Sequence, residues 1–493
     1  MNRLNLKCCH HQVYGTRSLI TGGIADNNNN LHANIIKLDK PGASVLPELE
    51  KLTKKERKIA VLLGIIRDLR MRKRYTQALE VAEWMHNAGV CKFTPGKHAV
   101  RLDLISRVHG VDSAESFFNS LGDQEKTIQT HGALLHVYVR ERLTDKSLSY
   151  FEKMKEMGLP LDALTYNNIM ALYMNTNKYD KVPTVLAEMK DNGISPDKVS
   201  YSMCITSCLE RSDLDGMDKV LQEMEQTEIR VEWNTYGMVA NSHIKAGHNG
   251  KALVYLKKAE DTLEKKDALG YNHLITLYAS LGNKSEMLRL WNLKKECCEK
   301  YINIDYITML GSWVKLGDFE EAEKLLNEWE SSTCNYDFRV PNTLLVGYCK
   351  KGLVDKARKI LTDIVQEGKT PIPNSWGIIA LAYVNKNEME KALECMELAI
   401  KLCVGTSRAW RPNPKVIAAI LSWLGDNGQV EEVENFVGLL KNVIPMNRQI
   451  YHALIKANVR QGKEVDELLE IMKSDNKIEE DEETKKILQL KIN

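Results

Sequence analysis

Tyrosine recurs at a fixed interval along the middle of the chain, and apolar residues follow it at helical spacing. The interval is 35 residues, and the positions are Tyr166, Tyr201, Tyr236, Tyr271 and Tyr306. Apolar residues three and four positions after each tyrosine mark one face of an amphipathic helix. A fixed period in the range of about 20–50 residues is typical of a solenoid of stacked repeats.

Counting each tyrosine as the fourth residue of its unit gives a register for the array. The first helix carries the tyrosine, a turn follows, and a small residue in the second helix permits close packing of the two. Units are predicted at 128–162, 163–197, 198–232, 233–267, 268–302, 303–337, 338–372, 373–413, 414–447 and from 448 onward. Left-handed turn glycines are predicted at Gly247, Gly282, Gly317, Gly352 and Gly428. The small residues are Ala252, Ala322, Ala357 and Ala392.

The same pattern extends toward both ends of the chain. A shorter unit is predicted near 97–127, and a second helix near 75–88. Because a lone hairpin cannot bury its apolar face, the hairpins must stack. The sequence therefore predicts an all-α fold, a solenoid superhelix of about eleven helix-turn-helix repeats of 35 residues. The first helices are expected to form one concave wall.

Composition changes this picture little. The 493 residues carry a formal net charge of +2, so overall basicity does not indicate a partner. The eleven cysteines are scattered without a CxxC pair, which favours buried thiols over a disulfide framework. Cys204 and Cys208, one helical turn apart, are expected in the core. No apolar run approaches the roughly 18 residues of a membrane span.

The two ends of the chain differ from the array. Residues 1–30 hold three basic residues before their first acid, Asp26, and lack a continuous apolar stretch. This predicts an organelle transit peptide and linker over 1–30. A lead-in over 31–59, the repeat array over 60–475 and an acidic tail over 476–493 complete the expected organisation.

Catalytic signatures are missing from the sequence. It has no Walker A loop, no GxSxG, no HExxH and no HxE…CxxC arrangement. His131 occupies the tyrosine position of its unit and is expected to be structural. We therefore expect no enzyme and no cofactor or metal.

Several units resemble the pentatricopeptide repeat family. The clearest is ALTYNNIMALYMNTNKYDKVPTVLAEMKDNGISPD at 163–197, with its TYN start and GISPD exit. The resemblance covers roughly residues 60–475, and the uniform 35-residue spacing looks like the P-type members of plant mitochondria or plastids. Phrases such as RLDLISRVHG and LITLYASLGN resemble a plant mitochondrial subgroup.

This resemblance implies that single-stranded RNA binds on the concave wall, one base per repeat. In the family, the fifth and last residues of a unit read the base edge and the second residue sandwiches the base. The matching readers here are Asn167, Asp197, Ser202, Glu232, Asn272, Asp337 and Asn342. The apolar sandwich positions are Leu164, Val199, Leu269 and Ile304, whereas Gln129, Asn234, Arg339, Asn374 and Lys415 are polar.

Only the pair Asn167 and Asp197 fits the family pattern fully, and it is the pair that favours uridine. In other units a glycine or an isoleucine takes one of the two reading positions, as at Gly132, Gly237 and Ile302. Lysine or arginine recurs at the end of the first helix. These side chains either neutralise RNA phosphates or are favoured there because a positive charge interacts well with the C-terminal end of the helix dipole. They are Arg140, Lys245, Lys315, Lys350 and Arg460.

Two functions remain open at this point. The first is a non-catalytic organellar RNA-binding protein, mitochondrial or else plastid, acting in RNA processing, stability or translation. The alternative is a protein-interaction scaffold or structural component of the mitochondrial ribosome with little sequence readout. The sparse reading pairs favour the alternative, and the family resemblance favours RNA binding.

Overall fold

The computed structural model describes residues 28–38, 43–53, 57–298, 301–332, 335–403, 410–476 and 478–489. The chain divides into two compact units, Met1–Val231 and Glu232–Asn493, each described here by itself. In the described ranges all regular secondary structure is helical, as the sequence predicts. None of the described helices has the length and apolar character required to cross a bilayer. The predicted transit segment lies almost wholly outside the described residues.

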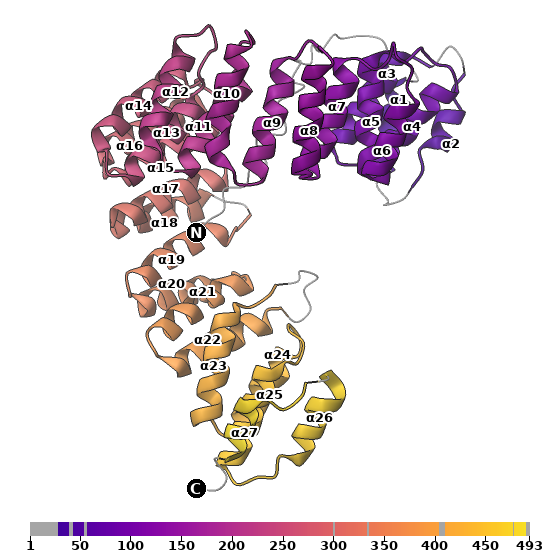
Figure 1. Ribbon diagram of the computed structural model, residues 1–493. Coiled ribbons are helices and arrows are strands. Elements are labelled where there is room, and N and C mark those ends of the chain that lie inside the picture. The colour runs from indigo at the N-terminus through magenta and orange to yellow at the C-terminus, as the bar shows by residue number, and fades with distance from the viewer. Residues whose placement is uncertain are drawn as a thin grey trace. The chain divides into compact units, whose positions relative to one another are not determined.

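The first unit is a stack of antiparallel hairpins (Figure 1). Its α-helices, together with the short 3-10 helix η2, are α1 (Asn28–Lys37), α2 (Leu46–Glu50), α3 (Ile59–Met71), α4 (Tyr75–Asn87), α5 (Pro95–His109), α6 (Val111–Ser120), α7 (Ile128–Arg140), α8 (Thr144–Glu156), α9 (Ala163–Asn175), η2 (Tyr179–Lys181), α10 (Val182–Asp191), α11 (Lys198–Glu210) and α12 (Leu214–Glu225). Helix α1 packs on α3 and α2 packs on α4, so the predicted lead-in continues the hairpin pattern.

The second unit repeats the same design (Figure 1). Its helices are α13 (Trp233–Lys245), α14 (Asn249–Thr262), α15 (Ala268–Ser280), α16 (Lys284–Cys297), α17 (Asn303–Leu316), α18 (Phe319–Ser332), α19 (Arg339–Lys350), α20 (Val354–Gln366), α21 (Pro373–Asn385), α22 (Met389–Lys401), α23 (Pro414–Asn427), α24 (Val430–Leu440), α25 (Arg448–Arg460), α26 (Asp466–Asn476) and α27 (Glu482–Gln489). Helix α27 lies in the predicted acidic tail, yet it packs on α25 through buried Thr484 and Ile487.

The predicted register agrees with the helix boundaries. From α7 onward, first helices begin at the first residue of their predicted repeats, as at Ala163, Lys198 and Ala268, except that α19 starts one residue late, at Arg339. Helix α5 starts at Pro95, two residues before the unit predicted near 97–127. Pro341 falls in the first turn of α19, where its missing N–H costs no helical hydrogen bond. Successive first helices pack on one another from α5 to α11 in the first unit and from α13 to α25 in the second, so they form a row in each.

The five tyrosines that recur every 35 residues belong to the core. All five are buried, and the hydroxyl of Tyr166 accepts a hydrogen bond of 3.0 Å from the amide of Asn192 at the end of α10. The hydroxyl of Tyr201 donates to Glu223 on α12 at 2.8 Å. Each of these two rings therefore ties the start of a first helix to the end of its second helix. Cys204 and Cys208 are also buried, as expected.

The turn after the first helix has a recurring backbone geometry along the chain. Gly247, Gly282, Gly317 and Gly352 have φ between 73° and 80°, the left-handed conformation expected there. The prediction for Gly428 is wrong, since its φ is −73° and its ψ is 156°. Helix α23 continues to Asn427 and leaves in an extended conformation instead. Other repeats place non-glycine residues in the left-handed position, namely Lys73, Arg142, Asn177, Ser212 and Asn387.

The predicted small residues of the second helices are fully buried. Ala252, Ala322, Ala357 and Ala392 are each 0% exposed. A methyl side chain at this position lets the two helices of a hairpin pack closely.

Candidate nucleic-acid interface

The predicted base-reading positions lie in the first turns of the first helices and at the caps that precede them. Asp197 is the N-cap of α11, and its Oδ1 accepts from the backbone N–H of Ser200 at 2.8 Å. Asp and Asn are strongly favoured N-caps because they satisfy the free N–H groups of a first turn. Asp162, Asp267, Asn413 and Asn447 cap the next first helix in the same way. The last residue of a repeat therefore has a structural role whether or not it reads a base.

The structure brings Asn167 and Asp197 together. Asn167 Nδ2 donates to Asp197 Oδ1 at 3.0 Å, and Asn167 Oδ1 accepts from the hydroxyl of Ser200 at 2.7 Å. The carboxylate can only accept, so the amide orientation is fixed. All hydrogen bonds of the Asp197 carboxylate seen among the described residues use Oδ1. One N–H of Asn167 and the Oδ2 of Asp197 therefore remain available.

A second asparagine is locked by a different set of partners. Asn272 Nδ2 donates to Asp305 Oδ1 at 2.8 Å, and Asn272 Oδ1 accepts from Lys294 Nζ at 2.8 Å. Lys294 also pairs directly with Asp305, and the two side chains are 0% and 1% exposed. Asp305 Oδ2 accepts from the backbone N–H of Ile302 at 3.0 Å. Asn272 therefore keeps one spare N–H, and Ile302 supplies no acceptor beside it.

Asn342 is the third asparagine at a reading position, and its environment differs again. Its side chain is only 7% exposed, and its Oδ1 has no hydrogen-bond partner among the described residues. A buried acceptor without a partner costs about 1–3 kcal/mol, which a donor from a ligand would recover. Ile372, the last residue of this repeat, offers no polar group.

Two of the remaining predicted readers, Asp337 and Ser202, already have hydrogen-bond partners within the protein. Asp337 binds the guanidinium of Arg339 through both oxygens and accepts from Asn303 at 3.1 Å, so it is already saturated. The hydroxyl of Ser202 donates back to the carbonyl of Lys198 at 2.7 Å within α11. Glu232 begins the second unit, whereas Ser202 lies in the first.

The predicted sandwich residues present apolar surface to solvent. Leu164, Leu269 and Ile304 are 43%, 67% and 43% exposed, and Val199 is half-buried. Leu164 and Val199 are the second residues of α9 and α11, and Leu269 and Ile304 are the second residues of α15 and α17. Because α9 packs on α11 and α15 packs on α17, each pair lies on neighbouring first helices. Exposed aliphatic side chains in this arrangement can hold a base between them.

The predicted phosphate contacts divide into two kinds. Lys245 and Lys350 are exposed at the ends of α13 and α19. Three others reach back to the preceding first helix: Lys315 donates to Ser280 at 2.8 Å, Arg460 to the carbonyl of Gly425 at 3.0 Å, and Arg140 to Asp103 at 2.9 Å. Burial lowers the pKa of Lys315. These three bases therefore join successive repeats before any ligand is bound.

Sequence reasoning missed the residues that lock the asparagines. Ser200 and Asp305 are the third residues of their repeats, and Lys294 lies in a second helix. A signal was present, because buried polar residues recur at the third position, where Thr130, Thr165, Thr235 and Ser375 also lie. Lys294 carries no such signal, since a lysine in a second helix is usually exposed.

Comparison with known proteins finds matches to one repeat family. The PPR repeat family model matches residues 161–210, and the PPR repeat model matches 129–159, 304–334 and 340–368. A mitochondrial pentatricopeptide repeat-containing protein of Arabidopsis thaliana is 48% identical over 462 residues, covering 93% of this chain and 94% of that protein. The Arabidopsis large ribosomal subunit protein mL101 is 32% identical over 162 residues, 33% of each chain.

Among solved structures, the pentatricopeptide repeat protein PPR10 from maize matches at 16% identity with a TM-score of 0.39, covering 94% of this chain and 85% of that one. The 48% identity over nearly the whole of both chains identifies the family by itself. On this evidence, together with the hairpin array and its register, the chain belongs to the pentatricopeptide repeat family.

Proposed function

We propose that the protein binds single-stranded RNA in mitochondria, without catalysis, and acts in RNA processing, stability or translation. Asn167 and Asp197 carry the proposal. They leave one donor and one acceptor unused, beside the apolar side chains of Leu164 and Val199. Uracil presents an N–H between two carbonyl oxygens on its Watson–Crick edge, which complements this pair. The expected preference at this repeat is uridine.

Readout elsewhere in the array is expected to be weaker. Asn272 offers a donor between Leu269 and Ile304 but has no neighbouring acceptor, and Asn342 offers an acceptor instead. Lys245 and Lys350 add positive charge at the ends of first helices. The protein is therefore expected to anchor RNA at a few bases and to hold the rest through its phosphates.

A cap-preserving substitution tests the proposal. Asp197→Asn retains a good N-cap and removes the carboxylate, so the fold should persist while the preference for uridine falls by about 1–3 kcal/mol, the range of a base-edge contact. Asp162→Asn is the matched control, because Asp162 caps α9 in the same way and its repeat has glycine at the fifth position, Gly132.

The measurement is binding of the full chain to a set of short RNAs that differ in one base. Equal affinity of the wild-type protein for every base at every position would refute sequence readout. A shift of equal size in both variants would show that the cap, rather than the reading pair, controls binding.

The second candidate is a structural component of the mitochondrial ribosome. It is favoured by the saturated Asp337 and by the similarity to mL101 over part of the chain. Co-sedimentation of the endogenous protein with ribosomal subunits, resistant to high salt, would support it. RNA recovered by crosslinking from isolated mitochondria would separate ribosomal RNA from messenger targets. Recovery from plastids instead would overturn the mitochondrial assignment.

A further inference from the structure

Repeat 233–267 has no side chain at its fifth position, and an aromatic ring from the next first helix lies against that position. The fifth residue is Gly237 of α13, and the ring belongs to His273 of α15, which packs on α13. A Cβ at Gly237 would lie 3.0 Å from His273 Cδ2 and 3.1 Å from His273 Nε2, closer than side chains normally approach. The imidazole therefore occupies the space that a reading side chain would need.

A second aromatic ring packs beside the imidazole. Trp233, the first residue of α13, has its ring centre 5.7 Å from that of His273, at an interplanar angle of 51°. Its indole N–H donates to Asp267 Oδ2 at 2.7 Å, so the tryptophan itself is held in place. Gly270 leaves room for it, because a Cβ there would lie 3.2 Å from Trp233 Cε2. Two glycines thus make space for two aromatic side chains at one step of the array.

The other positions of this repeat that would contact a base contribute little. Asp267, the last residue, uses Oδ1 for the backbone N–H of Gly270 at 2.9 Å and Oδ2 for Trp233. The sandwich position is Asn234, which is polar and exposed, whereas Leu269 of the next repeat is apolar and 67% exposed. A base at this step would therefore have an aliphatic side chain on one side only.

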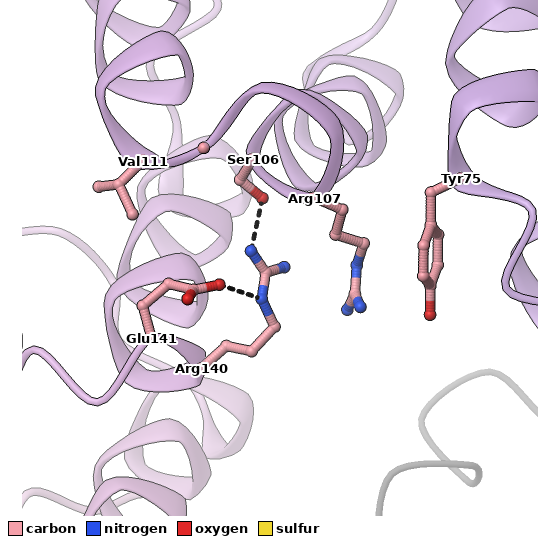
Figure 2. A pocket seen from close by; sticks show the side chains of 7 residues that line it. Tyr75, Ser106, Arg107, Val111, Arg140 and Glu141 are labelled. Atoms are coloured by element: carbon pink, nitrogen blue, oxygen red, sulfur yellow. Dashed lines mark hydrogen bonds and ion pairs between the residues drawn. The ribbon is translucent and has the colours of Figure 1, made fainter. Parts of the chain in front are cut away.

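The imidazole of His273 is available to a ligand. Its ring nitrogens make no hydrogen bond to a described residue, whereas Arg140 of α7 already donates to Ser106 at 2.9 Å and to Glu141 at 3.0 Å (Figure 2). His273 is exposed to solvent, yet desolvation by the surrounding helices lowers its pKa, so the ring is uncharged at neutral pH. An uncharged, exposed aromatic ring is suited to stacking on a base rather than to pairing with a phosphate.

We propose that His273 stacks on an RNA base at repeat 233–267 and so takes over the contact that Gly237 cannot make. The inference rests on the proposed function, because it needs RNA on the row of first helices. Every base presents a π-face, so this contact anchors the strand without selecting a sequence. Leu269 supplies the aliphatic side chain on the other side of the base. This repeat therefore differs from repeat 163–197, where polar groups meet the base edge.

The test measures binding of the full chain to a short oligouridine, to an oligocytidine of equal length, and to the oligouridine with one abasic nucleotide at each position in turn. His273→Ala removes the ring, His273→Phe keeps an aromatic ring without nitrogens, and His273→Asn keeps polar groups without the ring. Gly237→Ala places a methyl group against the imidazole and forces it to shift. Gly132→Ala is the matched control, because Gly132 is also a fifth residue and a Cβ there meets no atom within 4 Å.

His273→Ala and His273→Asn should each weaken binding to both strands about 5- to 150-fold, the range for losing one stacked base, and His273→Phe should stay within about 3-fold of the wild-type protein. The abasic position that weakens binding of the wild-type protein but not of His273→Ala marks the base on the ring. Gly237→Ala should weaken binding, and Gly132→Ala should not. Each His273 variant should keep a melting temperature close to that of the wild-type protein, since His273 is exposed.

Wild-type affinity in His273→Ala would overturn the stacking contact. Retained binding in His273→Asn together with loss in His273→Phe would also overturn it, because the ring would then contact a base edge through a hydrogen bond. Equal affinities of Gly237→Ala and Gly132→Ala would count against it in the same way, since the position of the ring would not matter. A wild-type protein that binds neither strand overturns the proposed function and this contact together, whereas RNA binding that persists unchanged in every His273 variant overturns this contact alone.

Discussion

Lys294 gives the sharpest test of how the array is held together. Its ammonium is fully buried in α16 and contacts Asp305 of α17 and Asn272 of α15, so three helices meet at one charge. Lys294→Met keeps the length and apolar stem of the side chain and removes only the charge. It leaves the Asp305 carboxylate buried without its cation and the Asn272 oxygen without its donor.

The expected cost is large because the carboxylate remains. Removing one member of a buried ion pair costs about 3–5 kcal/mol, since the other charge is left uncompensated in a medium of low polarity. For a unit of this size, about 2–4 °C per kcal/mol converts the loss to a fall of roughly 6–20 °C in Tm. Lys294→Met/Asp305→Asn removes both charges, and the amide that replaces the carboxylate retains an acceptor for the Ile302 N–H. The double variant should cost less than Lys294→Met alone by about 2 kcal/mol.

The assay is urea unfolding of the full chain, followed by circular dichroism, with hydrogen exchange over α15–α17 to localise the loss. A change in the midpoint at constant slope reports stability rather than altered compactness. Hydrogen exchange should accelerate first in α15–α17, because each hairpin is stabilised by its immediate neighbours. A cost below about 1 kcal/mol for Lys294→Met, or a double variant less stable than Lys294→Met, would refute the reasoning.

Three further outcomes are expected. Ser212→Gly should raise the free energy of unfolding by about 0.5–1 kcal/mol, because Ser212 has a φ of 58° and glycine adopts this left-handed conformation without strain. Asn387→Gly should change the free energy of unfolding little, because asparagine tolerates the left-handed conformation. Chemical denaturation checks both variants. Ala357→Leu should cost about 1–3 kcal/mol, since it inserts side-chain volume into a fully buried helix contact, and a melting curve measures it. Burial lowers the pKa of His98 and of His131, so both side chains favour the neutral form in the folded protein. The stability that they contribute is therefore complete above about pH 6.5, the pKa of an unfolded histidine, and is lost as the pH falls through their folded pKa values. His98→Gln/His131→Gln should therefore flatten the fall in stability between about pH 7 and 5, and an unchanged pH profile would contradict this.

The repeat register predicts which residue types stand at the reading positions, but not which hydrogen bonds those residues already make. The register paired Asn167 with Asp197, and their side chains are in contact at 3.0 Å; that they read a base stays a prediction. The same register also predicted Asn272 as a reader, although Lys294 and Asp305 already occupy its amide. A pattern along the chain gives the residue type at a position but not how many of its hydrogen bonds are already used.

The basic residues at the ends of first helices show the same limit. Their phase in the repeat was evident, yet Arg140 binds Asp103, which lies 37 residues earlier, and Arg460 binds a carbonyl 35 residues earlier. Stacking places residues about one repeat apart in direct contact. A basic side chain that looks free in the sequence can therefore already be bound to a group in the neighbouring hairpin. The turn at Gly428 differed for a related reason, since the length of α23 decides which residue leaves the helix.

The sequence by itself determined the helical class, the 35-residue period, the helix starts and most of the left-handed turns, because these depend on local spacing and backbone sterics. Only the tertiary structure decided that the hydroxyls of Tyr166 and Tyr201 join helix ends and that Lys294 is buried with a partner. Those outcomes depend on contacts between hairpins, where the choice of partner is set by distance in space and by the cost of leaving a buried polar group unpaired.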